Sequence, residues 1–149
     1  MKNIFFAAAW LIAVFAAPQS HAQDTSKMTA DTQFVVMAQA LVNQHFAIWG
    51  DPSSDRIAKF AAVYTSDITV ADYAAVATGY SDVNQVIGRV QKQHEGFKFS
   101  PEPVTWNHGF GRVRWGFGPQ DNPNLVRGED IFTVRDGKLS SLHVFLDNK

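Results

Sequence analysis

The stretch GEDIFTVRDGKL, residues 128–139, contains the strongest structural signal in this chain. An alternation of apolar and polar residues leads directly into Asp136-Gly137, a dipeptide typical of a two-residue turn between antiparallel strands. A second alternating segment follows the turn. The stretch therefore predicts a β-hairpin with strands over 125–135 and 138–146.

Shorter alternating runs occur upstream of the hairpin, separated by proline and glycine. They predict further strands over 68–73, 97–99, 104–108 and 112–117. An irregular stretch, 74–80, follows the first of these strands.

Elsewhere upstream of residue 97, the apolar residues recur with the period of a helix. The predicted helices cover 30–49, about 51–64, and 81–96, where Ser81 is expected to cap the third. In the second helix, the residues expected to face inward are Ile57, Phe60, Ala61 and Tyr64. Because helices come first and most strands come later, we predict an α+β domain in which three helices pack on a curved antiparallel sheet.

The N-terminus predicts export. Lys2 precedes an apolar run, and the small-residue ending Ser20-His21-Ala22 follows it, as in a cleaved signal peptide. The run of about 14 residues is short against the ~20 that span a bilayer. We therefore expect a signal peptide over 1–22, a short leader over 23–30 and one domain over 31–149. The mature protein would be secreted or periplasmic, with no membrane attachment after cleavage.

The composition excludes several classes of protein. The chain has 149 residues, a formal net charge of −1 and no cysteine, so one domain stabilised by packing rather than disulfides is expected. No basic run occurs, which argues against nucleic acid as a partner. The arginines expected on a solvated or subunit-facing surface of the strands are Arg112, Arg114, Arg127 and Arg135. Metal-ligand spacings and phosphate-binding loops are absent from the sequence, so no cofactor is expected.

Two carboxylates stand in series that otherwise hold apolar side chains. Asp130 precedes Phe132 on the inward face of the first hairpin strand, and Asp72 closes the alternation in the strand over 68–73. A carboxylate on a buried face either loses its hydration or lines a cavity that uses it. Such groups suit proton transfer. Together with His45 on the first helix, these aspartates are the candidate catalytic residues.

Each candidate also has a structural alternative. Asp72 could accept hydrogen bonds from backbone amides of the loop that follows it. Asp130 could pair with an arginine or histidine of a neighbouring strand, and His45 could be a satisfied helix histidine. The large aromatic residues that could either line a ligand pocket or fill the core are Trp49, Tyr64, Trp106 and Trp115.

The other histidines give weaker signals. Whether His108 and His143 face a pocket depends on strand register, because a slip of one residue reverses the face. His94 is expected to interact with the carboxyl-terminal end of the third helix.

Three further strings occur in a fixed order with residues 128–139, and together they resemble the NTF2-like superfamily. These strings are Ala47-Ile48-Trp49, VYTSDITV at 63–70, and Val113-Arg114-Trp115. The resemblance covers roughly Thr32 to Asp147. The superfamily includes the ketosteroid isomerases, scytalone dehydratase and the SnoaL-type polyketide cyclases. The resemblance implies a cone-shaped pocket where the helices cover the curved sheet.

The resemblance to the ketosteroid isomerases also implies roles for the candidate residues. Asp72 stands at the position of the base, and Asp130 matches the protonated acid that donates to the substrate oxygen in that family. His45 falls near the position of the family's oxyanion tyrosine. The chain departs from the pattern twice, since a histidine replaces that tyrosine and Tyr73 stands where those isomerases carry proline.

Two functions follow as hypotheses. The first is a cofactor-free enzyme that acts on a small apolar carbonyl or polyketide-like compound by isomerisation, cyclisation or dehydration. The second is a non-catalytic module of the same fold that binds a hydrophobic ligand or docks a partner. The resemblance further implies a homodimer through the outer face of the sheet, with the arginine-bearing strands and Trp106 at the contact.

Overall fold

The computed structural model describes residues 22–148 of the chain, with side chains described from Thr32 onward. Apart from Ala22, the signal peptide predicted over 1–22 lies outside the described residues. The helices are α1 (Ala22–Trp49), the 3-10 helix η1 (Ser54–Lys59), α2 (Phe60–Val63) and α3 (Gly79–Gln93). The strands are β1 (Tyr64–Ala71), β2 (Val76–Thr78), β3 (Lys98–Pro101), β4 (Thr105–Asn107), β5 (Phe110–Gly118), β6 (Val126–Arg135) and β7 (Lys138–Leu146).

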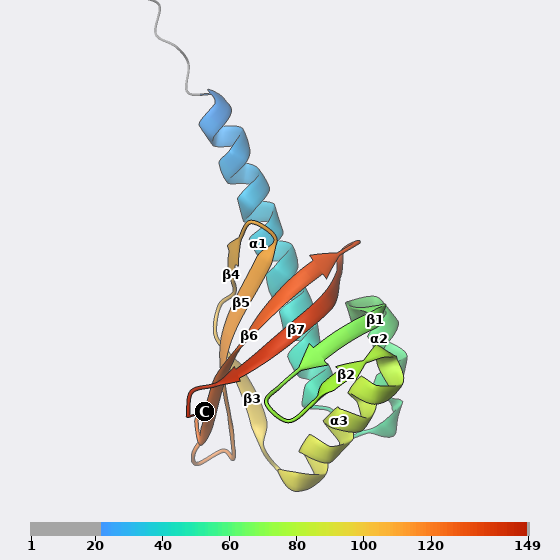
Figure 1. Ribbon diagram of the computed structural model, residues 1–149. Coiled ribbons are helices and arrows are strands. Elements are labelled where there is room, and N and C mark those ends of the chain that lie inside the picture. The colour runs from blue at the N-terminus through green and yellow to red at the C-terminus, as the bar shows by residue number, and fades with distance from the viewer. Residues whose placement is uncertain (1–21, 149) are drawn as a thin grey trace, which may run out of the picture.

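The strands form one curved sheet in the order β2-β1-β7-β6-β5-β3, with β4 also paired to β5. The predicted α+β architecture, with helices packed on one curved sheet, is confirmed (Figure 1). The expectation of a wholly antiparallel sheet is wrong for one pair, because β1 and β7 run parallel. Parallel neighbours need a long connection. Here α3 and all the intervening strands supply it.

The predicted hairpin is confirmed. β6 and β7 pair antiparallel up to Arg135 and Lys138, and the two residues between them have positive φ, 53° at Asp136 and 71° at Gly137. A two-residue turn with both φ values positive matches the right-handed twist of the flanking strands. The local sequence therefore sets the pairing next to the turn, and a register shift between Thr133 and Val134 changes it along the rest of the hairpin.

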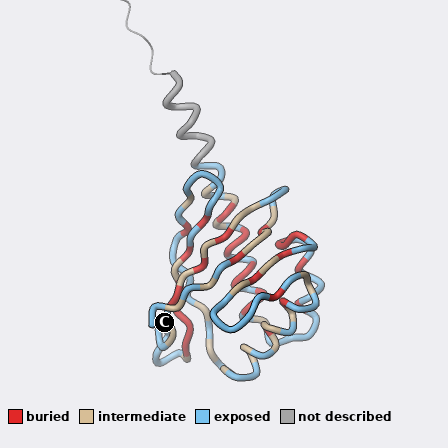
Figure 2. Tube along the Cα trace, in the orientation of Figure 1, coloured by how far each residue is buried: buried red, intermediate tan, exposed pale blue. Residues whose placement is uncertain are grey.

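The core lies between α1 and the inner face of the sheet. α1 runs behind β5, β6 and β7 in Figure 1, and all four of these elements contain buried segments in Figure 2. On α1 the buried positions recur with helical spacing and include Ala38, Leu41, Val42, Phe46 and Ile48. From the strands, Val113, Phe132 and Leu142 meet this helical face. Packing of these apolar surfaces supplies most of the free energy that stabilises such a layer.

Several predicted boundaries are wrong. α1 begins at Ala22, so the segment expected to be a leader is helical. The second helix is shorter than predicted, because its last expected residue, Tyr64, already has the extended backbone of β1. Phe60 faces inward as predicted, but Ile57 is 40% exposed and Ala61 is also exposed, since the 3-10 geometry of η1 rotates the apolar positions away from one stripe.

The segment after β1 also differs from the prediction. The stretch expected to be irregular contains the edge strand β2, which pairs with β1 through Val70 and Ala77. Thr78, rather than Ser81, precedes α3, and its side chain makes no capping hydrogen bond. Pairing with β1 makes this short segment a strand, although its sequence carries only a weak strand signal.

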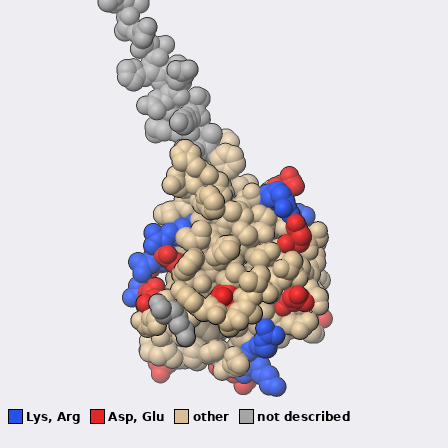
Figure 3. All heavy atoms as spheres, viewed as in Figure 1, with Lys and Arg blue, Asp and Glu red and all other residues tan. Residues whose placement is uncertain are grey.

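The strand arginines lie at the surface, as predicted, and form ion pairs. Arg112 pairs with Glu129, Arg135 with Asp67, and Arg114 and Arg127 both approach Asp147. On the face shown in Figure 3, basic and acidic side chains lie beside one another. Within residues 22–148, no helix is both long and apolar enough to cross a membrane.

Candidate functional site

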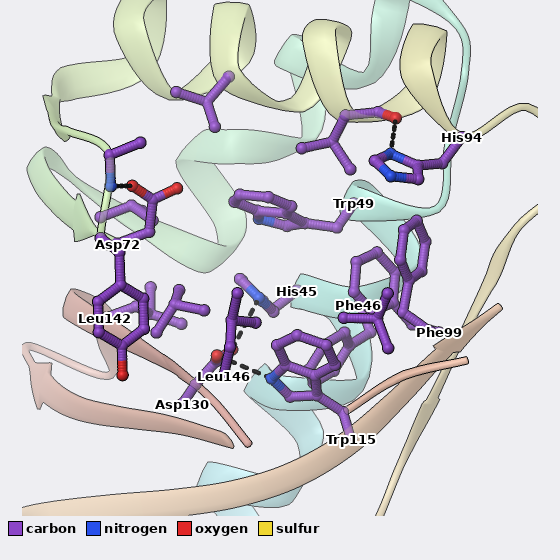
Figure 4. Close-up of a pocket in the computed structure, with 18 residues that line it drawn as sticks. His45, Phe46, Trp49, Asp72, His94, Phe99, Trp115, Asp130, Leu142 and Leu146 are labelled. Atoms are coloured by element: carbon purple, nitrogen blue, oxygen red, sulfur yellow. Dashed lines mark hydrogen bonds and ion pairs between the residues drawn. The ribbon is translucent and has the colours of Figure 1, made fainter. Parts of the chain in front are cut away.

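An apolar cavity lies between the inner face of the sheet and helices α1 and α3 (Figure 4). Its volume is about 470 Å³, which falls in the range typical of small-molecule sites. Its apolar lining includes the rings of Phe46, Trp49, Phe99 and Phe117 and the aliphatic side chains of Val86, Val90 and Leu142. The ionisable side chains that face it are His45, Asp72, Tyr73, His94 and Asp130. The cavity therefore offers few polar groups in an apolar surface.

Asp130 is buried on β6 and faces two ring nitrogen atoms from other elements. The indole Nε1 of Trp115, on β5, donates a hydrogen bond of 2.8 Å to Oδ1 of Asp130. Nε2 of His45, on α1, lies 3.6 Å from Oδ2. This second distance is too long for a good hydrogen bond. The cavity thus has a polar end, where Oδ2 of Asp130 and Nε2 of His45 face each other without a close hydrogen bond between them.

Gly128 allows Trp115 to reach this carboxyl group. A Cβ atom at Gly128 would lie 2.8 Å from the Trp115 ring and 2.5 Å from the backbone oxygen of Phe145. Both distances are shorter than van der Waals contact. The absence of a side chain at this position therefore lets the indole lie across β6, next to Asp130.

Tyr64 supports His45 from the side away from Asp130. Its hydroxyl lies 2.9 Å from Nδ1 of His45, and its ring is fully buried. Burial raises the pKa of Tyr64 well above its usual range, and the nearby Asp130 adds to the rise, whereas the Trp49 indole opposes it. Tyr64 is therefore a neutral hydroxyl in the folded protein.

An alkaline titration should show that Tyr64 does not ionise in the folded protein. The chain has three tyrosines, and we expect the folded protein to lack the ultraviolet tyrosinate signal of one of them until it unfolds. The Tyr64→Phe variant should give the same folded-state signal as the wild type. Because the folded pKa of Tyr64 exceeds the unfolded one, its contribution to stability is intact below about pH 10 and is lost as the pH rises further. A smaller folded-state signal in the variant would contradict the assignment.

Asp72 lies in the turn after β1 rather than in the core, so the expectation that it points into a buried core is wrong. It is exposed, and its Oδ1 accepts hydrogen bonds of 2.8 Å from the backbone N–H groups of Ala74 and Ala75. The pairing of β1 ends one residue earlier, which frees the backbone for this turn. The loop-capping alternative is thus correct for one oxygen. In Figure 4 the other oxygen points into the cavity, across from His45 and Asp130.

The alternative for Asp130 is realised only in part. The residue near its Oδ2 is a histidine of α1, not an arginine or histidine of a neighbouring strand. Among the ion pairs of residues 32–148, none joins Asp130 to an arginine. The strand arginines instead form their ion pairs on the outer face of the sheet.

The four aromatic candidates separate into two groups. Trp49 and Trp115 line the cavity, as the ligand-binding interpretation required. Tyr64 lies behind His45, and Trp106 stacks on Phe34 at a ring distance of 6.0 Å, away from the cavity. Trp106 sits on the short strand β4, which pairs with β5, and no residue of β4 lines the cavity.

The remaining histidines also separate. His108 lies in the β4–β5 turn and His143 is exposed on β7, so neither lines the cavity. His94 ends α3, and its Nδ1 lies 3.1 Å from the oxygen of Val90, in keeping with the expected helix-end interaction. It also lines the cavity beside Phe117. Sequence reasoning missed this second role, although the helical spacing of Val86, Val90 and His94 was a usable signal.

The described residues include no group of three or more His, Cys, Asp or Glu side chains arranged to hold a metal ion. The polar side chains that line the cavity are His45, Asp72, Tyr73, His94 and Asp130, together with the indoles of Trp49 and Trp115.

Comparison with solved structures shows that the chain has the NTF2-like fold. A SnoaL-like family protein from Agrobacterium tumefaciens, assigned as a candidate isomerase, is 16% identical with a TM-score of 0.69, over 75% of this chain and 98% of that one. A candidate SnoaL-like polyketide cyclase from Jannaschia sp. CCS1 is 16% identical, with a TM-score of 0.63 over 76% and 87% of the two chains. A candidate ketosteroid isomerase from Kribbella flavida is 17% identical, with a TM-score of 0.55 over 74% and 77%.

No protein-family model and no curated protein sequence matches this chain. At the identities found, the likeness to solved structures shows the fold, whereas activity has to be argued from the site.

Proposed function

We propose that this chain is an exported enzyme that needs no cofactor and transfers a proton next to the carbonyl group of a small apolar compound. The observation that carries the proposal is the placement of the carboxyl groups, with Asp72 on one side of an apolar cavity and Asp130 beside His45 on the other (Figure 4). A substrate held between them would have a base at one end and hydrogen-bond donors at the other. Isomerisation, cyclisation and dehydration all begin with such a step.

Asp72 acts as the base in this proposal. Two backbone N–H groups hold its Oδ1, which fixes the side chain and leaves Oδ2 free toward the cavity. Oδ2 takes the proton from the carbon next to the carbonyl. The C–H electron pair forms the new carbon–carbon double bond, and the carbonyl π electrons move onto oxygen to give an enolate. When the substrate has a carbon–carbon double bond at the β,γ position, the enolate extends over it, and return of the proton to the γ-carbon completes an isomerisation.

His45 and a protonated Asp130 bind the enolate oxygen. The 3.6 Å between Nε2 and Oδ2 is too long for a mutual hydrogen bond. An oxygen atom placed near both could accept a hydrogen bond from each. Trp115 fixes the other oxygen of Asp130, so the donor pair is already oriented before a substrate binds. Such prearranged donors stabilise charge that develops in the transition state.

Incorporation of solvent deuterium tests this proposal. A bicyclic ketone such as 2-tetralone has exchangeable hydrogens next to its carbonyl and suits a cavity of about 470 Å³. We expect the protein to accelerate incorporation above the rate in buffer. Val90→Phe, which fills the cavity from α3, should abolish the acceleration and ligand binding. Val36→Phe is the matched control, because Val36 is an exposed helical valine on α1.

Binding without turnover is the second candidate function. It is favoured by one observation: Asp72 is exposed, and one of its oxygens already serves the turn. The two functions give different results in the same experiment. Ketones that bind, as read from the fluorescence of Trp49 and Trp115, without any deuterium incorporation above buffer would contradict proton transfer and support the binding function.

The proposal of export rests on Lys2 and the apolar run that ends before Ser20-His21-Ala22. Mass spectrometry of the exported protein should find Gln23 as its first residue. Recovery of the protein only from the cytoplasm, with an intact N-terminus, would contradict it.

A further inference from the structure

The hydroxyl of Tyr64 sits next to Nδ1 of His45 and has no role in the proton transfer described above. The two atoms are 2.9 Å apart, and both side chains are buried. At this distance one of the two atoms must donate and the other accept. The direction of this hydrogen bond determines which nitrogen of His45 carries the proton in the neutral ring.

The surroundings of Tyr64 decide that direction. Among the described side chains, Nδ1 of His45 is the one acceptor with which the Tyr64 hydroxyl makes a hydrogen bond. The Trp49 indole, which also lies close to Tyr64, has an N–H group that can only donate. If His45 donated from Nδ1, the Tyr64 O–H would be left buried without an acceptor. Such a buried donor without an acceptor destabilises the folded protein, because its lost hydration is not replaced.

We infer that Tyr64 is a positioning residue that donates to Nδ1 of His45 and thereby places the His45 proton on Nε2, facing Asp130 and the polar end of the cavity. The consequence for chemistry rests on the proposed function: His45 is then a hydrogen-bond donor to the substrate oxygen rather than an acceptor. The opposite tautomer would present a lone pair to a developing negative charge and oppose the reaction.

Tyr64 is itself held firmly enough to set the orientation of another residue. Its ring packs edge-on against Phe60 at a centroid distance of 5.1 Å. Its backbone oxygen accepts a hydrogen bond of 2.9 Å from the Tyr80 hydroxyl of α3. Tyr64 also begins β1, where it pairs with Leu139 of β7. The position of the hydroxyl is therefore determined by three elements, not by His45.

The proton position can be read directly by NMR of protein labelled with ¹⁵N-histidine, at a pH where the ring is neutral. A His45→Gln variant identifies the His45 signals. We expect the wild type to carry the proton on Nε2 and to show the Nδ1 frequency of a nitrogen that accepts a hydrogen bond. In Tyr64→Phe the Nδ1 signal should move to the frequency of a nitrogen without such a bond. Tyr73→Phe removes the hydroxyl of an exposed tyrosine that packs on Phe145 rather than on Tyr64 or His45, and it should leave both signals in place.

Two results would overturn the inference: a proton on Nδ1 in the wild type, or an Nδ1 frequency that is the same in the wild type and in Tyr64→Phe. If Tyr64→Phe does not fold, the wild-type spectrum alone still decides the tautomer. The measurement needs no substrate. A positive NMR result with no deuterium incorporation would therefore leave the positioning role intact and contradict only the proposed proton transfer.

Discussion

Replacing Asp72 with Asn is expected to lower the rate of deuterium incorporation by a factor of about 10²–10⁴, the usual contribution of a general base. The substitution is specific to the chemistry, because the amide oxygen of Asn can still accept the two hydrogen bonds from Ala74 and Ala75. The turn should therefore keep its shape. What is lost is the free carboxylate oxygen on the cavity side, which an amide N–H group replaces.

Ligand binding should survive in Asp72→Asn, since the apolar lining that supplies most of the affinity is unchanged. Asp67→Asn is the matched control: Asp67 is an exposed carboxylate on β1, the strand that precedes Asp72, and it pairs with Arg135 outside the cavity. Both variants should be assayed for incorporation and for quenching of tryptophan fluorescence by the ketone. An unchanged rate in Asp72→Asn would remove Asp72 as the base.

The Phe132→Ala substitution should have the largest effect on stability, a loss of about 3–5 kcal/mol in the free energy of unfolding. Phe132 is 0% exposed at the centre of the sheet, where it pairs with Gly111 on one side and Leu142 on the other. Its ring also contacts Trp106. Truncation would remove this contact area and leave a cavity that three strands and α1 cannot close. Domains of this size are stable by only about 5–15 kcal/mol, so much of the margin would be lost.

Urea denaturation, followed by circular dichroism, measures this loss as a lower midpoint with an unchanged slope. Phe110→Ala is the control, because Phe110 is 59% exposed at the start of β5 and its truncation should cost no more than about 0.5 kcal/mol. Equal losses in the two variants would show that Phe132 does not occupy the centre of the core. Phe132 does not line the cavity, so this result is independent of the proposed function.

The fold could be predicted where local and short-range signals are strong. Asp136-Gly137 selects a two-residue turn by its backbone preferences alone, and the alternation on either side then aligns β6 with β7. The inward position of Asp130 follows from the same alternation, because side chains on a strand face opposite sides in turn. The helical stripe of α1 likewise places His45 on the buried face.

The candidate site was predicted less completely, for a physical reason visible at Asp72. Strand alternation places this residue inward only while the strand continues, and the sequence does not show that β1 ends at Ala71 and turns. The cavity-lining roles of Phe99 and His94 were missed in a similar way. They depend on how β3 and α3 approach the sheet, and pattern within one segment carries no information about that approach.

From the sequence alone came the order of the elements apart from β2, the β6–β7 hairpin, the buried face of α1 and the presence of a carboxyl group on the inner face of β6. Each of these depends on neighbours within a few residues or on one repeating period. The tertiary structure decided the parallel pairing of β1 with β7, the contact of Tyr64 with His45 and the 3.6 Å gap between His45 and Asp130. These features join residues far apart in the chain, and their geometry is settled only when the helices and the sheet pack together.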